Sequence, residues 1–447
     1  MNFIKKTISF TIIFGIIFSS LALTPCKASY KLPFETQSDC IYMLNLDTGT
    51  VVFQKNADKK TFPASLTKIM TAIIALENVK DLNTVITAPA YIYDELFGLG
   101  ASTADIRSYE QVRMIDLLYA MMLPSACEAS SIIADYVGDG NITEFVEKMN
   151  AKAKELGATN SNFTNAHGLF DENQVTTAKD MAIITEYALK LPMFKKISST
   201  PIYTMPKTNK HAQPYNIYHT NSMIRKGTSN YKYMSGVKTG TLPEVGKNLV
   251  STASKDGYNY LLVTIGAPQT DKAGKPLPNG SYSDAKALYD WAFSYFKMQT
   301  IINEKDVITE TPVKLSSQQD HIQLLAKEDI TTLLPKDANE SSIQQIKTVV
   351  PTVIAPVKKG TVLGKLDLKV NNEIIATVEL VSGQDVSRSG VLYGLDVTKR
   401  FFDKTLIKCL IIILILIILI TIVMKARYNK IKRIKQNRER KLKNNIS

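Results

Sequence analysis

Apolar and polar residues alternate along this chain in patterns that predict two folded segments of different type. Residues 40–46 and 51–54 form two apolar runs around a turn at 47–50, which is typical of a β-hairpin. Apolar residues then recur at helical spacing, and three strand-like runs follow before a last helix. The expected helices span 64–78, 111–122, 129–137, 145–156, 177–189 and 283–297, and the expected strands span 233–239, 247–254 and 258–266. This order predicts an α+β domain at 30–300 with a mainly antiparallel sheet.

The pattern changes after residue 300. Residues 307–380 are rich in Val, Ile, Thr, Lys and Pro, and short strand-like runs replace the helical periodicity. We therefore expect a small all-β domain at 303–396.

The first 28 residues have the form of a secretory signal peptide. Two lysines precede an apolar stretch at 8–23, and Cys26-Lys27-Ala28 offers a small-x-Ala cleavage site. A lipoprotein signal through Cys26 is the alternative, but Pro25 is bulkier than the small residue that such sites need. We expect cleavage after Ala28.

The other end of the chain predicts a membrane anchor. Residues 405–424 are apolar on all sides except for Lys408, and about 20 such residues are enough for a helix to cross the bilayer. Because the basic run 425–447 follows at once, the positive-inside rule places it in the cytoplasm. A peripheral amphipathic helix is the alternative, and the all-round apolar surface argues against it.

Charge and composition exclude several classes of function. The net charge is +13, but 425–447 alone carry ten Lys or Arg against one Glu, and 1–28 carry three Lys and no acid. The remainder is close to neutral, so nothing favours a nucleic-acid partner. Only Cys40 and Cys127 lie in the exported part, which is too few for a disulfide framework. No metal-site or phosphate-loop motif occurs, so we expect no metal and no cofactor.

Three short motifs carry the candidate chemistry, and the first is Ser65-Leu-Thr-Lys68 at the start of an expected helix. Residues three apart share one helix face, so the lysine amine can act as the base that a weakly nucleophilic hydroxyl needs. The spacing alone is a weak signal, because Ser-x-x-Lys occurs at five places. These begin at Ser65, Ser229, Ser235, Ser283 and Ser294.

The second motif, Lys238-Thr239-Gly240-Thr241, lies on an expected edge strand and occurs once. A cation and a hydroxyl there can hold a substrate carboxylate, the glycine lets a substrate backbone approach, and a strand amide can stabilise an oxyanion. The third motif, Ser125-Ala-Cys127, lies between the other two on a loop between two helices. The ordered set Ser-x-x-Lys, a serine motif and Lys-Thr-Gly is typical of penicillin-binding proteins and class A β-lactamases.

With these motifs the chain resembles the low-molecular-mass D-alanyl-D-alanine carboxypeptidases, a family of penicillin-binding serine peptidases. Phe62-Pro-Ala-Ser65-Leu-Thr-Lys68, Asn165-Ala-His-Gly168-Leu and Thr177-Ala-Lys-Asp-Met181 all look like blocks of that family. Pro356-Val-Lys-Lys-Gly-Thr-Val-Leu-Gly364 resembles its C-terminal β-rich domain. The resemblance implies a penicillin-binding, β-lactamase-like fold, peptidoglycan stem peptides as substrates and β-lactams as covalent inhibitors.

Site roles follow from the resemblance position by position. It implies that Ser65 is the acylated nucleophile, Lys68 its base and Ser125 a proton relay to the leaving amine. Lys238 then supplies positive field and Thr239 holds the terminal carboxylate. The backbone N–H groups of Ser65 and Thr241 form the oxyanion hole, and His167 is structural.

The chain departs from the family pattern at two positions. Cys127 stands where the family normally has an asparagine that binds the substrate peptide. A thiol bonds weakly, and the loss costs about 0.5 to 1.5 kcal/mol, or roughly a factor of ten in rate. Ser281 stands about where relatives often place an arginine. Cys127 itself is a poor candidate nucleophile, because no neighbour is a clear base and Glu128 opposes the thiolate.

Two alternatives stay open beside the hydrolase. A β-lactamase needs a deacylating base, and Glu172 lies in the right interval, although its surroundings match the carboxypeptidase block. A catalytically weak wall-binding scaffold, decayed through Cys127, is the other.

Overall fold

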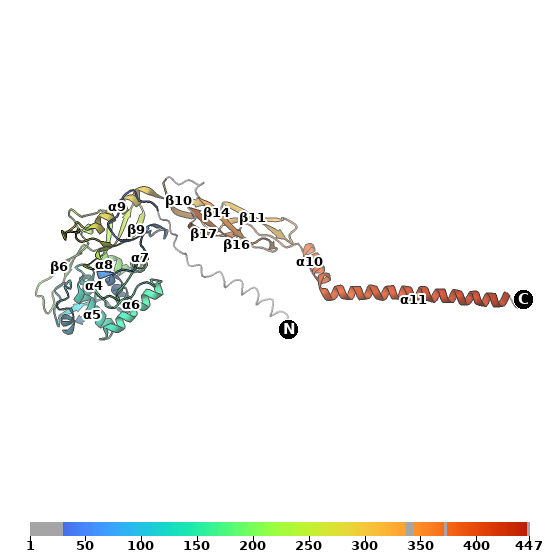
Figure 1. Cartoon of the computed structure of the whole chain (residues 1–447), viewed down its shortest axis with the longest axis horizontal. Helices are drawn as coiled ribbons and strands as arrows, with labels where there is room; N and C mark the ends of the chain where they lie inside the picture. The colour runs from blue at the N-terminus through green and yellow to red at the C-terminus, as the bar shows by residue number, and fades with distance from the viewer. Residues whose placement is uncertain (1–29, 337–342, 371–372, 445–447) are drawn as a thin grey trace. The chain divides into compact units, whose positions relative to one another are not determined.

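The computed structural model describes residues 30–336, 343–370 and 373–444 (Figure 1). The signal peptide expected at 1–28 lies outside these residues. The chain divides into two compact units. The first holds the residues up to Ile301 with Thr331–Gln344 and Leu368–Ala376, and the second holds the rest.

An antiparallel sheet forms the centre of the first unit, in the strand order β2-β1-β9-β8-β7. Its strands are β1 (Cys40–Asn45), β2 (Val51–Lys55), β7 (Met234–Leu242), β8 (Gly246–Lys255) and β9 (Tyr258–Ala267). The hairpin and the three later strands were all expected from the sequence. β7, which carries the Lys-Thr-Gly motif, lies at an edge of the sheet, where a cation and a hydroxyl can hold a substrate carboxylate.

Helices cover both faces of this sheet (Figure 1). They are α2 (Lys68–Asn78), α3 (Tyr91–Leu96), α4 (Met114–Met122), α5 (Cys127–Val137), α6 (Ile142–Leu156), α7 (Ala178–Leu189), α8 (Pro192–Ser198) and α9 (Gly280–Tyr295). Successive side chains of a strand point to opposite faces. Tyr42 and Leu44 therefore join the core that contains α2, α4, α5 and α7, whereas Ile41 and Met43 pack in the core that contains α9. The α+β prediction is confirmed.

All six expected helices begin or end at other residues in the structure, and three of them change to another type of element at one end. Residues 111–122 were expected to be helical throughout, but β4 (Gln111–Arg113) pairs with β3 (Val85–Thr87), and α4 begins only at Met114. The pairing buries Val112, so tertiary contact overrides the local helical period. The helix expected at 283–297 ends at Tyr295, where β10 (Phe296–Ile302) starts. The one expected at 64–78 opens with a 3-10 turn, η1 (Ala64–Thr67).

Strands dominate the second unit, as the sequence predicted. A six-stranded sheet has the order β14-β16-β17-β12-β11-β15. These strands are β11 (Val307–Lys314), β12 (His321–Ala326), β14 (Gln344–Val349), β15 (Val353–Ile354), β16 (Val362–Val370) and β17 (Glu373–Ser382). β13 (Ile330–Pro335) lies almost wholly in the first unit, where it pairs with β10. The apolar centre of the second unit contains the fully buried side chains of Ile322, Leu324, Leu366 and Leu380.

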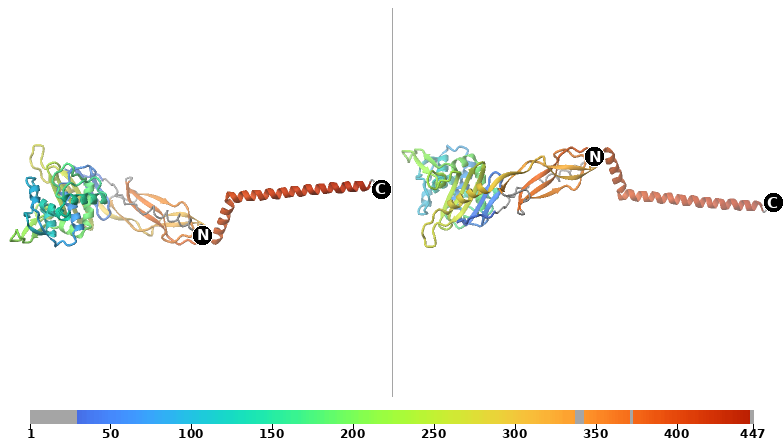
Figure 2. Two further views of the ribbon diagram at one scale, coloured as in Figure 1. Left: turned by 90° about the horizontal axis from the view of Figure 1, so that it is seen from below. Right: turned by 90° about the horizontal axis from the view of Figure 1, so that it is seen from above.

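Two helices end the described chain. Residues 390–396, which the sequence placed in the β-rich segment, are instead the first turns of α10 (Gly390–Asp403), capped by the Ser389 side chain. Cap chemistry was the signal available there. α11 (Thr405–Asn444) follows as one uninterrupted helix (Figure 2). Among the described residues, it is the one helix long and apolar enough to cross a membrane.

Candidate active site

Ser65 and Lys68 lie where η1 runs into α2. Lys68 ends the 3-10 turn and begins the α-helix, and its Nζ lies 3.1 Å from Ser65 Oγ. Ala64 has φ +51°, a strained conformation for a residue with a side chain. Gly168 packs directly against this residue, because a Cβ on Gly168 would lie 2.0 Å from the Ala64 carbonyl oxygen. Gly168 therefore permits the approach that presents the serine.

The Lys68 ammonium group is fully buried and donates to three groups. Besides Ser65 Oγ, Nζ lies 3.6 Å from Cys127 Sγ and 2.5 Å from the carbonyl oxygen of His167. Burial lowers the pKa of Lys68 below that of a free lysine, while the nearby Cys127 and Glu128 oppose this shift. A lowered pKa makes the neutral amine easier to reach, which is the form that a general base needs.

Ser125 lies between α4 and α5, on the loop that the sequence predicted, whereas Cys127, which was expected on the same loop, is the first residue of α5. Ser125 has φ +71°, and its Oγ is buried with no hydrogen-bond partner among the described residues. A buried unpaired hydroxyl is costly and suggests a group reserved for a ligand. Cys127 is a buried free thiol, and its backbone N–H donates to the carbonyl oxygen of Ser102 at 2.8 Å.

The Lys-Thr-Gly strand lies directly against the Ser65 turn. A Cβ on Gly240 would lie 3.2 Å from the Ser65 nitrogen and 3.1 Å from Ala64 Cβ. From the sequence, we expected Gly240 to leave room for a substrate backbone. The structure shows that the protein's own turn needs the space.

Lys238 is fully buried beside this contact, with Nζ 3.1 Å from the carbonyl oxygen of Thr239. Burial lowers the pKa of Lys238 well below its usual range, and the charge of Lys68 adds to the effect. Thr239 Oγ1 donates to Thr220 Oγ1 at 2.6 Å. The structure thus gathers the residues of all three motifs around Lys68.

Several residues that hold this arrangement were missed from the sequence. Asn248 Nδ2 donates to the carbonyl oxygens of Phe62 and Pro63, just before the serine. Asn221 Nδ2 donates to the carbonyl oxygen of Gly236, and His219 Nε2 lies 3.1 Å from that of Val237. All three are buried polar side chains that hydrogen-bond to backbone groups of other chain segments. No pattern of neighbouring residues in the sequence predicts such contacts.

The remaining sequence candidates lie in ordinary structural settings. Burial and the charge of Lys68 lower the pKa of His167 to about 3, so its ring stays neutral while its carbonyl holds Lys68. Glu172 is exposed. Ser281 is buried at the start of α9, where its Oγ donates to Asn279 Oδ1.

Residues 27–269 match the peptidase S11 family, D-alanyl-D-alanine carboxypeptidase. The chain belongs to this family. As an S11 member it is a serine-type carboxypeptidase, and residues 296–388 match the C-terminal domain of penicillin-binding protein 5.

Curated relatives of this S11 carboxypeptidase match it over most of their own length, and they are named D-alanyl-D-alanine carboxypeptidases. D-alanyl-D-alanine carboxypeptidase DacF of Bacillus subtilis is 27% identical over 87% of this chain and 96% of its own. The D-alanyl-D-alanine carboxypeptidase of Streptomyces sp. strain K15 is 31% identical over 62% of this chain and 93% of its own.

Solved structures agree with this assignment. Penicillin binding protein 5 of Haemophilus influenzae superposes with a TM-score of 0.64 and 26% identity, covering 80% of this chain and all of that one. The Streptomyces K15 DD-transpeptidase gives a TM-score of 0.54 at 27% identity, covering 59% of this chain and all of that one. The fold predicted from the sequence is confirmed.

Proposed function

We propose that this carboxypeptidase removes the terminal D-alanine from peptidoglycan stem pentapeptides through an acyl-enzyme on Ser65. The observation that carries the proposal is a buried amine of lowered pKa placed 3.1 Å from a serine hydroxyl. A hydroxyl becomes a useful nucleophile only beside a base that can take its proton. Lys68 meets that requirement.

The proposed reaction has two steps. Ser65 Oγ attacks the carbonyl carbon of the D-Ala-D-Ala bond, and its proton passes to neutral Lys68. Ser125, whose Oγ is unpaired, relays a proton to the leaving nitrogen, so that the C–N bond breaks and D-alanine departs. Water then attacks the ester, one of its protons returns through Lys68 to Ser65 Oγ, and the shortened peptide leaves.

The Lys-Thr-Gly strand supplies binding and charge in this proposal. The edge position of β7 lets a substrate lie beside it, with the terminal carboxylate on Thr239 and near Lys238, whose charged form that carboxylate stabilises. Backbone N–H groups of Ser65 and Thr241 stabilise the oxyanion. The approach of Gly240 to the Ser65 nitrogen supports this pairing.

Benzylpenicillin tests the acyl-enzyme directly. The full-length protein in detergent is incubated with the drug, its intact mass is measured, and any adduct is mapped on peptides. We expect one adduct, on Ser65, because a β-lactam acylates a serine that has a working base and oxyanion hole. A folded protein without an adduct would favour the scaffold hypothesis, and rapid release of hydrolysed drug would favour a β-lactamase.

Replacing Cys127 with asparagine is expected to raise the acylation rate by up to about tenfold, because an amide restores a substrate hydrogen bond that a thiol makes poorly. The rate is measured on a D-Ala-D-Ala peptide by D-alanine release. Cys127→Ser is the control, since it keeps the size and adds no amide. Activity in Cys127→Asn but none in the parent protein would show a decayed site.

We also propose an extracytoplasmic catalytic domain with a cytoplasmic basic tail. Support comes from α11, whose apolar part is followed directly by the lysines and arginines of 425–447. A signal peptide at 1–28 delivers the domain to that side, and the helix keeps it on the membrane.

A further inference from the structure

Glu128 is a buried carboxylate that the proposed mechanism does not use. It is the second residue of α5, directly after Cys127, and it is 3% exposed. Among the described residues, no lysine or arginine forms an ion pair with it. Burial raises the pKa of Glu128. A buried carboxylate without a direct ion-pair partner is expensive to keep, so its position calls for a specific use.

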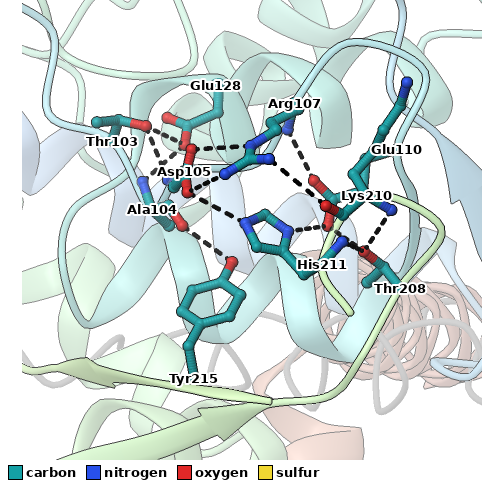
Figure 3. Close-up of polar contacts among 10 residues, drawn as sticks. All are labelled: Thr103, Ala104, Asp105, Arg107, Glu110, Glu128, Thr208, Lys210, His211 and Tyr215. Atoms are coloured by element: carbon teal, nitrogen blue, oxygen red, sulfur yellow. Dashed lines mark hydrogen bonds and ion pairs between the residues drawn. The ribbon is translucent and has the colours of Figure 1, made fainter. Parts of the chain in front are cut away.

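The Glu128 carboxylate accepts hydrogen bonds from the loop 97–110, which joins α3 to β4 (Figure 3). One oxygen, Oε1, accepts from Thr103 Oγ1 and from the backbone N–H of Ala104, both at 2.7 Å. The carbonyl oxygen of Ala104 accepts from Tyr215 OH at 3.0 Å. The Ala104 residue is therefore held on both sides of its backbone.

The same loop contacts the catalytic motif through its backbone. Ser102, next to Thr103, accepts the N–H of Cys127 at 2.8 Å. Cys127 in turn lies 3.6 Å from Lys68 Nζ and two residues after Ser125. Hydrogen bonds and the chain link from Thr103 to Ser102 therefore form a short path from the Glu128 carboxylate to the groups around Ser65.

The C-terminal end of the same loop is held through the carboxylate of its own last residue, Glu110. Glu110 Oε1 accepts from Thr208 Oγ1 at 2.7 Å and lies 2.9 Å from His211 Nδ1. His211 Nε2 lies 3.1 Å from Asp105 Oδ2 (Figure 3). Glu110 is as deeply buried as Glu128 but makes none of the contacts with Ala104 or Ser102. Two buried carboxylates thus hold one loop, and only Glu128 holds the residues next to Ser102, which contacts the active site.

We propose that Glu128 is a positioning residue of the carboxypeptidase reaction, which fixes Thr103 and Ala104 so that Ser102 holds the Cys127 backbone beside Lys68. The inference rests on the proposed function. Misplacing catalytic groups by a fraction of an ångström slows a reaction strongly, whereas the first binding of a ligand depends on other contacts. The loss of Glu128 therefore slows the acylation step more than it weakens initial binding.

The test compares acylation by a fluorescent penicillin in the full-length protein and its variants, with initial binding and the limiting acylation rate separated by stopped flow. We expect Glu128→Ala to lower the limiting rate about 10- to 100-fold with initial binding changed less than about threefold. Glu128→Gln keeps an acceptor oxygen and is expected within about threefold of the parent. Thr103→Val removes one donor at an exposed position and is expected to give an intermediate loss.

Glu110→Ala is the matched control, since it frees the far end of the same loop. It is expected to lower the melting temperature as much as Glu128→Ala does while acylation stays within about threefold of the parent. Equal acylation losses in both variants would mean that general loosening of the loop is the cause, and would overturn the inference. Parent-like acylation in Glu128→Ala, or in Thr103→Val if Glu128→Ala does not fold, would overturn it too. A parent protein that is not acylated at all would instead refute the proposed function.

Discussion

Ser65→Ala is expected to abolish both the penicillin adduct and the release of D-alanine, with a rate loss on the order of 10⁴ or more. In the proposed mechanism the Ser65 hydroxyl forms the ester, and among the described residues no other serine hydrogen-bonds to the Lys68 amine. The fold should persist, because the change removes one hydrogen bond worth about 1 kcal/mol. D-alanine release and thermal unfolding of the full-length variant check the two halves of this expectation.

The chain contains its own control for this experiment. Ser283 begins another Ser-x-x-Lys sequence, with Lys286, but Ser283 is exposed and Lys286 pairs with Asp290. Ser283→Ala should therefore retain full activity. Undiminished release in Ser65→Ala would rule out Ser65 as the nucleophile.

Lys68→Met is expected to lower the acylation rate by about 10² to 10⁴, because it removes the amine that we propose as the acceptor of the Ser65 proton. Only the neutral amine can act as a base, so the parent rate should rise with pH through the pKa of Lys68 and then level off. Burial lowers that pKa, so the rise should occur below the pH range in which a free lysine titrates. The measurement is the pH profile of penicillin acylation.

Lys68→Arg separates charge from basicity. Its guanidinium stays protonated throughout the accessible pH range, so the charge remains but the rise with pH should disappear. Lys286→Met, on the exposed Ser-x-x-Lys pair, should keep the parent profile. A parent-like profile in Lys68→Arg would exclude Lys68 as the base.

The sequence alone determined features that depend on neighbours along the chain. The Ser65–Lys68 spacing places both groups on one helix face, and their side chains meet as expected. Alternation identified the hairpin, because strand side chains alternate between faces, and strand-like runs identified the three later sheet strands. An apolar stretch of sufficient length identified the helix now seen as α11.

Tertiary structure decided whatever depends on chain-distant partners. The short β4 replaced a predicted helical turn because β3 was available to pair with it. Burial lowers the pKa of Lys68, and its amine is held by a carbonyl at His167, 99 residues away along the chain. The sequence indicated only that the charge of Glu128 opposes a thiolate at Cys127, whereas the structure shows that its carboxylate accepts hydrogen bonds from Thr103 and Ala104. Local patterns report which element a residue joins, whereas burial and long-range hydrogen bonds set the chemistry of its side chain, and these arise only when the elements pack.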